Sequence, residues 1–228
     1  MKLGALVSGG KDSLFAACKA KEGNELAVLI AIKSKNPESY MFHVPNIDLV
    51  KLQAKSMGLP LIFKETKGEK EVELEDLKTA IKEAKEKYQI EGVVSGAIFS
   101  KYQKERINKI CKELGLESIA PLWKNTPKLL WKKMLDNGFK IIFTAVAANG
   151  LGPEWLGRRI DEQALEQLVN LHNTCYVCTG GEGGEFESLV LDCPLFKKKI
   201  KILVSEKKWD EATQSGELII KKAELVEK

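Results

Sequence analysis

Short apolar runs alternate with amphipathic stretches over about the first 120 residues of the chain. The apolar runs, at residues 2–7, 25–32, 61–64 and 93–98, have the length and composition of buried strands. Between them, apolar positions recur every three or four residues, which predicts helices over 13–21, 47–57, 74–88 and 100–115. Strands and helices that alternate in this way build a parallel sheet with helices on both faces. We therefore expect a doubly wound α/β domain over residues 1–120.

The alternation weakens after residue 120, where we place a domain boundary. A helix is predicted from Thr126 and Pro127 to Gly138, because the first two residues favour a helix start and glycine favours a stop. The remaining pattern predicts a helix over 161–172 and strands over 140–148, 189–192, 200–204 and 217–225. We expect residues 121–228 to form a smaller α+β domain.

Composition and charge narrow the classes of function. Of the 228 residues, 44% are hydrophobic and 30% are charged, as in a folded globular protein. The formal net charge is only +4, and arginine occurs only at Arg106, Arg158 and Arg159, so the sequence does not predict a dense basic surface for nucleic acid. The preference for Lys and Glu over Arg and Asp is a pattern reported for proteins of hyperthermophiles.

Targeting signals and a disulfide framework are not predicted. No apolar run approaches the roughly 20 residues of a membrane span, and five cysteines are an odd number. We expect a cytoplasmic protein in a reducing environment. Soft metal ligands gather only at His172, Cys175, Cys178 and Cys193, with a spacing unlike that of a standard zinc finger. Buried thiols are our preferred interpretation, and zinc or an intracellular disulfide is the alternative.

Residues 8–13 (SGGKDS) follow the first predicted strand and open the first predicted helix. In open α/β sheets, ligands bind at this edge. Gly9 and Gly10 allow a tight turn in which backbone N–H groups converge on an anion, and Lys11 adds a positive charge. The hydroxyls of Ser8 and Ser13 add hydrogen-bond donors. The simpler alternative is a glycine turn with a capped helix.

Asp12 is the unusual residue of this segment, and in the simpler alternative Asp12 or Ser13 caps the helix. A carboxylate inside an anion site repels phosphate unless a divalent cation lies between them, so we infer that Asp12 binds Mg²⁺ together with a nucleotide. The segment is not a Walker A motif. It resembles the PP-loop of the N-type ATP pyrophosphatases. That resemblance implies an adenine-nucleotide alpha-hydrolase-like (HUP) fold, ATP held by its β- and γ-phosphates, and attack of a substrate oxygen on the α-phosphate.

Further segments resemble one family within that superfamily. They are SYMFH at 39–43, GAIFSKYQ at 96–103, GEGGEFES at 181–188 and LDCPLFKKKI at 191–200. In this order they resemble the diphthine–ammonia ligases, over residues 3 to about 204. Two departures are Ser188, where the family has Thr, and the Thr-Gly-Gly after Cys178, where it has a shorter spacing.

The resemblance implies a reaction and its participants. It implies an ATP-dependent ligase that adenylates the carboxylate of diphthine on translation elongation factor 2 and displaces AMP with ammonia. ATP and Mg²⁺ are then the cofactors, and the diphthine-bearing factor and ammonium are the partners. No membrane and no direct nucleic-acid contact is expected, and a homo-oligomer is compatible with the sequence.

The resemblance also implies roles for individual residues. The catalytic candidates are Lys11, Asp12, Glu182, Glu185 and Glu187. The nucleotide-binding candidates are Ser8, Gly9, Gly10, Lys11, Asp12, Ser13, Ile32 and His43, with Asp12 as metal ligand. The substrate-binding candidates are Tyr40, Gly96, Ser100, Tyr102, Gln103, Arg158, Gly183 and Gly184.

Several of these residues have a simpler alternative. The glutamates suit ammonium, the trimethylammonium of diphthine or a second Mg²⁺, or they form a solvated acidic turn. His43 and Tyr102 are equally compatible with packing, and Arg158 with a surface ion pair. Two other functions remain open, a tRNA-modifying PP-loop enzyme that uses Cys175 or Cys178 as sulfur carrier, and a non-catalytic adenine-nucleotide sensor.

Overall fold

The computed structural model describes residues 1–36, 45–69 and 71–228, which form two compact units, Met1–Lys124 and Asn125–Lys228. The first unit is a parallel five-stranded sheet in the order β3-β2-β1-β4-β5. Its strands are β1 (Lys2–Leu6), β2 (Glu25–Ser34), β3 (Leu61–Thr66), β4 (Gly92–Val94) and β5 (Glu117–Ile119). Its helices are α1 (Lys11–Ala20), α2 (Val50–Met57), α3 (Val72–Tyr88) and α4 (Lys101–Glu113), and the 3₁₀ turn η1 (Ile47–Leu49) precedes α2.

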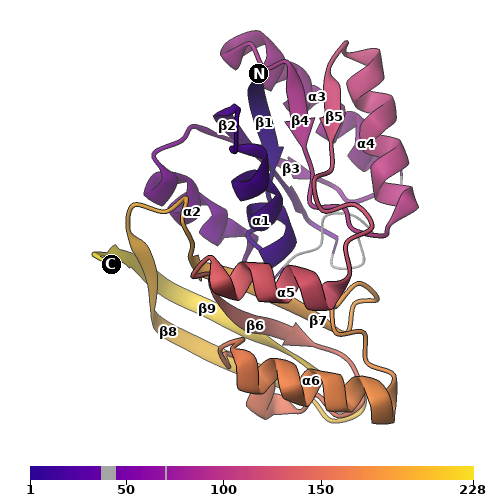
Figure 1. Ribbon diagram of the computed structural model, residues 1–228, viewed down its shortest axis with the longest axis vertical. Helices are drawn as coiled ribbons and strands as arrows, with labels where there is room; N and C mark the ends of the chain where they lie inside the picture. Colours follow the sequence, from indigo (N-terminus) through magenta and orange to yellow (C-terminus); the bar gives the residue numbers. More distant parts are fainter. Residues whose placement is uncertain (37–44, 70) are drawn as a thin grey trace. The chain divides into compact units, whose positions relative to one another are not determined.

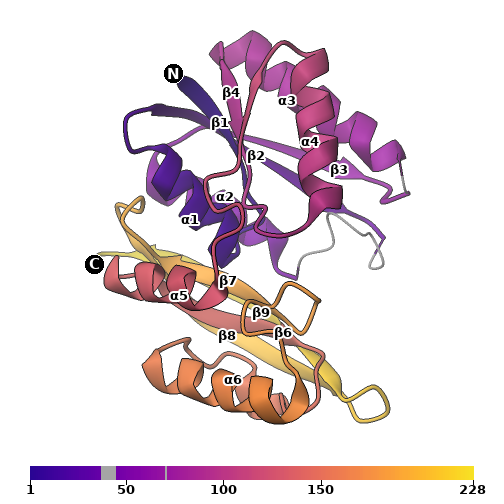
Figure 2. The same cartoon turned by 45° about the vertical axis from the view of Figure 1, so that its right-hand side comes forward.

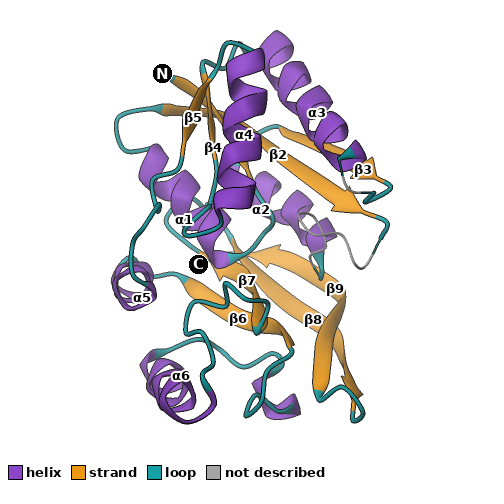
Figure 3. Cartoon of the chain, turned by 90° about the vertical axis from the view of Figure 1, so that its right-hand side faces the viewer, coloured by secondary structure: helices purple, strands orange, loops and turns teal. Residues whose placement is uncertain are grey.

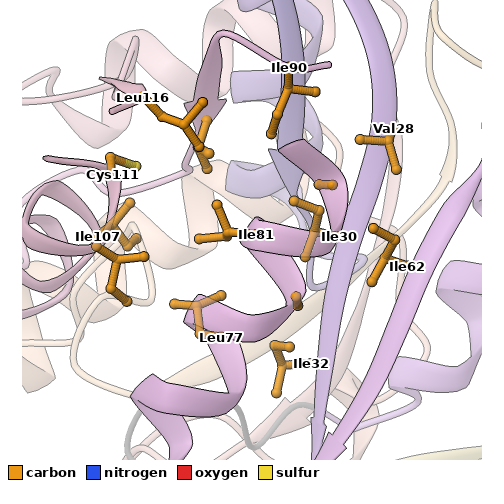
Figure 4. Packing of buried hydrophobic residues seen from close by; sticks show 14 residues of the cluster. Val28, Ile30, Ile32, Ile62, Leu77, Ile81, Ile90, Ile107, Cys111 and Leu116 are labelled. Atoms are coloured by element: carbon orange, nitrogen blue, oxygen red, sulfur yellow. The ribbon is translucent and has the colours of Figure 1, made fainter. Parts of the chain in front are cut away.

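Both faces of this sheet are covered, as its apolar strands require. Successive side chains of β2 point to opposite faces. Val28, Ile30 and Ile32 pack in one buried cluster with Leu77 and Ile81 of α3, which Figure 4 shows from close by. Residues of α4 complete the same cluster, and Figure 2 shows α3 and α4 on that side, with α1 and α2 on the other. The predicted doubly wound α/β fold is confirmed.

The strand order creates a switch point between β1 and β4. From β1 the chain proceeds outward to β2 and β3, and it then returns through α3 to β4 on the other side of β1 (Figure 1). The segments that follow β1 and β4 therefore diverge from one sheet edge. Ligands of open α/β sheets bind at such a point.

Two strands differ from their predicted extents. The run at 93–98 was predicted to be a strand throughout, but β4 ends at Val94 and its ladder continues only through the bond from Ser95 N to Ile119 O (2.9 Å). The chain leaves the sheet there, and Gly96 packs against the first turn of α1. β5 was not predicted, since a three-residue strand has too little pattern to detect.

The second unit is an antiparallel four-stranded sheet in the order β7-β6-β9-β8. The strands are β6 (Lys140–Val146), β7 (Phe186–Asp192), β8 (Lys199–Asp210) and β9 (Ser215–Val226). The helices are α5 (Pro127–Asp136) and α6 (Glu162–Cys175), with the 3₁₀ turn η2 (Pro153–Trp155). Figure 3 shows α5 and α6 on opposite faces of this sheet. An α+β unit was predicted here, and the structure has one.

β8 is longer than the predicted strand at 200–204. Its second half is polar and exposed, so it lacks an apolar pattern, but β9 pairs with it as far as Asp210. The strand is therefore held by its hairpin partner rather than by burial. None of the helices in the described parts of the chain combines the length and the apolar composition that crossing a membrane requires.

Candidate functional site

The segment 8–13 forms a closed turn between β1 and α1. Gly9 has φ of +86°, in the left-handed region that glycine adopts without strain. The Ser13 hydroxyl donates to Gly10 O (3.1 Å) and accepts from Ser8 N (3.2 Å). The N-cap residue of α1 is Gly10, which has no side chain to cover the first-turn N–H groups. These groups and the positive end of the helix dipole suit an anion, so residues 8–13 form the candidate anion site.

Lys11 and Asp12 supply the charges of this turn. Lys11 Nζ lies 2.5 Å from Asp12 Oδ2, and the two side chains are 7% and 26% exposed. The other oxygen, Asp12 Oδ1, is buried and has no hydrogen-bond partner in the described ranges. A buried carboxylate oxygen without a partner is costly, and Mg²⁺ prefers such oxygens as ligands. The position of Asp12 is therefore compatible with its expected role as a metal ligand.

Gly96, two residues after the end of β4, packs against α1. A Cβ atom on Gly96 would lie 2.7 Å from Ser13 N and 2.8 Å from the carbonyl carbon of Asp12. Both contacts are with backbone, which cannot yield as a flexible side chain does. Gly96 was predicted to contact substrate, and the structure places it directly against the first turn of α1.

Gln53 of α2 was missed by the sequence analysis. Its side chain is fully buried, and Nε2 donates to Gly9 O (3.0 Å). A glutamine inside an amphipathic helix has no distinctive pattern, so only the tertiary contact identifies it.

Two predicted substrate-binding residues at the start of α4, Ser100 and Tyr102, make contacts within that helix. Ser100 Oγ accepts a hydrogen bond from Gln103 N (3.3 Å), which makes Ser100 the N-cap that the sequence predicted. The Arg106 guanidinium carbon lies 3.3 Å from the centre of the Tyr102 ring, and Arg106 also pairs with Glu71 (3.1 Å). Ser100 and Tyr102 thus both have structural contacts, and Gln103 is half-buried in the same turn.

Ile32 and His43 were the other nucleotide-binding candidates of this unit, and Tyr40 was a substrate-binding candidate. The Ile32 side chain belongs to the buried cluster against α3, so only its backbone remains for a ligand. Tyr40 and His43 lie outside the described residues.

In the second unit, Glu185 organises the glycine-rich loop. Its Oε2 accepts from Gly183 N (2.8 Å) and its Oε1 accepts from Cys178 N (3.3 Å). Gly183 is suited to this contact because a Cβ there would lie 2.8 Å from Glu185 Oε1. Trp131 of α5 anchors the same loop by donating from Nε1 to Thr179 O (2.7 Å). We predicted a flexible loop, but these hydrogen bonds hold its backbone at Cys178, Thr179 and Gly183.

The three predicted glutamates are in different settings. Glu182 is exposed in the loop, near Gly184 with its φ of +85°. Glu187 lies in β7, because the strand begins at Phe186, and its register partner in β6 is Ala145. Ala145 also pairs with Glu217 of β9, so Glu187 and Glu217 flank a small residue on one face of the sheet. Glu217 was missed because strand register is not visible in the sequence.

Arg158 has partners within its own unit. Its guanidinium carbon lies 4.5 Å from the centre of the Trp155 ring, and Nη1 donates to Gln167 Oε1 of α6. These contacts support a structural role for Arg158 beside the predicted substrate role.

The preferred interpretation of buried thiols holds for Cys193, whereas Cys175 and Cys178 are half-buried. All five cysteines lie in described segments and form no disulfide. Burial raises the pKa of Cys111 to about 11, which keeps this thiol protonated at neutral pH. No group of three metal-ligating side chains that could hold a metal ion occurs within 1–36, 45–69 and 71–228. His172 instead contacts Val177 O through Nδ1 (3.0 Å).

The free energy of unfolding of Glu185→Gln tests whether Glu185 holds the glycine-rich loop in place. In Glu185→Gln, an NH₂ group replaces one acceptor oxygen and faces a backbone N–H. We expect the free energy of unfolding to fall by about 1–2 kcal/mol, and amide exchange at Gly183 to accelerate. Glu166→Gln, on the exposed side of α6, makes the same charge change as a control. Equal denaturant midpoints for the two variants would argue against the loop role.

The fold and the turn after β1 define a doubly wound α/β protein with a candidate anion site at its switch point. Comparison with known families agrees in both units. The model of the diphthamide synthase N-terminal domain matches residues 1–118, and that of the diphthamide synthase C-terminal domain matches residues 126–226. The chain belongs to the diphthamide synthase family.

Curated relatives cover nearly the whole chain. A diphthine–ammonia ligase of Mus musculus is 37% identical over 229 residues, and that of Homo sapiens is 35% identical over 226. Each alignment covers 90% of this chain and 84% of the relative. A crystal structure described as a predicted subunit of tRNA methyltransferase from Methanocaldococcus jannaschii aligns at a TM-score of 0.42 and 16% identity, over 85% of this chain and 98% of that one.

Proposed function

We propose that this chain is an ATP-dependent diphthine–ammonia ligase, which converts the carboxylate of diphthine on translation elongation factor 2 into the amide of diphthamide. Family membership and the names of the curated relatives support this class of reaction. The observation that carries the nucleotide part is the anion site after β1, where Asp12 Oδ1 is buried without a partner in the described chain.

The proposed chemistry has two steps because a carboxylate is a poor electrophile. A carboxylate oxygen first forms a bond to the α-phosphorus of ATP, and the bond to the β-phosphate oxygen breaks, which releases pyrophosphate. Ammonia then forms a C–N bond at the acyl carbon, and AMP leaves with the electron pair of the C–O bond. One proton is lost from nitrogen, so the products are the amide, AMP, pyrophosphate and a proton.

The residues of the first unit have roles in the first step. The N–H groups of the turn, the α1 N-terminus and Lys11 bind the β- and γ-phosphates, where negative charge grows as pyrophosphate leaves. Asp12 would hold Mg²⁺, which neutralises phosphate charge when bound. Preformed donors cost little reorganisation during the reaction.

The residues of the second unit have roles in binding the cation. Glu182 and Glu187 offer carboxylates that attract ammonium or the trimethylammonium of diphthine. Glu185 holds the loop that carries Glu182, so we assign it primarily to positioning. Glu217 joins this acidic group through its register with Glu187 across Ala145.

The test is a reconstitution with defined acceptors. Purified protein is incubated with ATP, Mg²⁺ and ammonium, together with diphthine-bearing elongation factor 2, with bulk tRNA or with no acceptor. We expect AMP and amide only with the diphthine-bearing factor, and transfer of one heavy oxygen from a labelled diphthine carboxylate to AMP. Turnover that depends on tRNA would support the tRNA-modifying alternative, and ATP binding without turnover would support the sensor.

A further inference from the structure

The peptide between Gly9 and Gly10 lies in the turn that precedes α1 and joins two glycines. Glycine populates both signs of φ with little steric cost, so this peptide is the easiest in the turn to rotate. In one orientation its N–H points into the turn and in the other its carbonyl oxygen does. The second orientation would present a negative partial charge to an anion. Anion binding therefore requires that the rotation be prevented.

Gln53 makes the contact that prevents it. Nε2 of Gln53 donates to Gly9 O (3.0 Å), and the Gln53 side chain has no solvent exposure. In a planar trans peptide the C=O and the following N–H point in opposite directions. A carbonyl held toward α2 therefore aims the Gly10 N–H into the turn, where it meets Ser8 Oγ (3.4 Å).

The other contacts of the turn do not hold the Gly9 carbonyl. Ser8 Oγ accepts from the N–H side of this peptide, at the longer distance of 3.4 Å. Ser13 Oγ donates to Gly10 O, which belongs to the next peptide along the chain. Gly96 packs against the backbone of Asp12 and Ser13. Gln53 is thus the side chain that holds the Gly9 carbonyl from outside the turn, 44 residues away in sequence.

We propose that Gln53 is a positioning residue of the phosphate site, which holds the Gly9–Gly10 peptide so that its N–H can exchange Ser8 Oγ for an oxygen of the β- or γ-phosphate of ATP. The inference rests on the proposed function, because it takes the ligand of this turn to be a nucleotide polyphosphate. Preorganisation of this kind lowers the free-energy cost of binding. The proposal predicts that loss of this contact weakens the binding of ligands with a β- or γ-phosphate and leaves the binding of AMP unchanged.

Gln53→Met tests the proposal. Methionine keeps the length and volume of the side chain but has no donor for Gly9 O. We expect the Kd for ATP and for inorganic pyrophosphate, measured by calorimetry with Mg²⁺, to rise about tenfold, which corresponds to about 1.4 kcal/mol. The Kd for AMP should remain within about twofold of the wild-type value. Equal losses for ATP and AMP, or no loss for ATP, would overturn the proposal.

Ala54→Gly is the matched control. It loosens the same helix at a buried position and leaves the Gln53 amide in place. We expect a lower unfolding temperature with an unchanged ratio of AMP to ATP affinities. If this ratio rises as much as in Gln53→Met, the effect comes from general loosening of α2 and the proposal is wrong.

A measurement on the unmodified chain remains available if Gln53→Met does not fold. Binding of pyrophosphate should shift the Gly10 amide proton in the NMR spectrum downfield, because that N–H gains an anionic acceptor. An unmoved Gly10 resonance in the saturated complex would refute the proposal. Failure of the unmodified chain to bind ATP or pyrophosphate would instead contradict the proposed function.

Discussion

Asp12→Asn should reduce ATP-dependent amide formation by about 10²–10³-fold while the protein remains folded. The substitution removes the negative charge that would hold Mg²⁺, but asparagine is close to aspartate in size. Asp12 lies in the first turn of α1, where loss of a negative charge costs about 0.3–1 kcal/mol through the helix dipole, and an asparagine oxygen can still accept the hydrogen bond from Lys11. The measurement is initial rate against Mg²⁺ concentration, together with thermal unfolding.

Asp48→Asn is a suitable control for that experiment. Asp48 is exposed and pairs with Lys33 and Lys51, whose hydrogen bonds hold its pKa below the usual value. The substitution Asp48→Asn removes one negative charge from the same unit, as Asp12→Asn does, but at a position outside the anion site. We expect near-normal turnover. Wild-type rates for Asp12→Asn at ordinary Mg²⁺ concentrations would rule out the metal role of Asp12.

Gly96→Ala should weaken ATP binding by at least about tenfold, a loss of about 1.4 kcal/mol. The new methyl group would meet the Ser13 nitrogen at 2.7 Å and the Ser13 Cα at 2.9 Å, so the first turn of α1 must shift. Overpacking of this kind costs about 1–3 kcal/mol of stability. The shift also displaces the N–H groups that face the anion. Calorimetric titration with ATP and Mg²⁺ measures the effect.

Ile107→Ala separates misplacement of α1 from loss of stability. Ile107 is buried in the cluster between α4 and the sheet, so its truncation costs about 2–5 kcal/mol through a cavity. It does not enlarge any residue beside α1. We expect ATP affinity to be retained at a temperature where this variant is folded. An equal loss of affinity in Ile107→Ala would show that Gly96 acts through stability alone.

The sequence predicts the elements of the first unit well because their patterns are local. β2 is apolar at nearly every position, and α3 repeats apolar residues every three or four positions, as buried elements do. Capping is also local, and Ser100 caps α4 as predicted. The exceptions are β4 and β5, where a glycine packed against another element and a very short strand leave no periodic pattern.

The second unit shows where local pattern is insufficient. Its loop was predicted from its glycines and glutamates to be flexible, but Glu185 folds back on two backbone N–H groups of the same loop. The second half of β8 is exposed and polar, so only its pairing with β9 defines it as a strand. Neither feature follows from residue type alone.

The sequence by itself determined the parallel sheet, the turn after its first strand and the charged chemistry of Lys11 and Asp12, because hydrophobic period and turn composition act over a few residues. Only the tertiary structure decided which distant residues support that chemistry. Gln53 reaches Gly9, Gly96 packs against Ser13, and Glu217 joins Glu187 across Ala145. Such contacts depend on strand order and register, which bring together residues far apart in the chain and which no local pattern specifies.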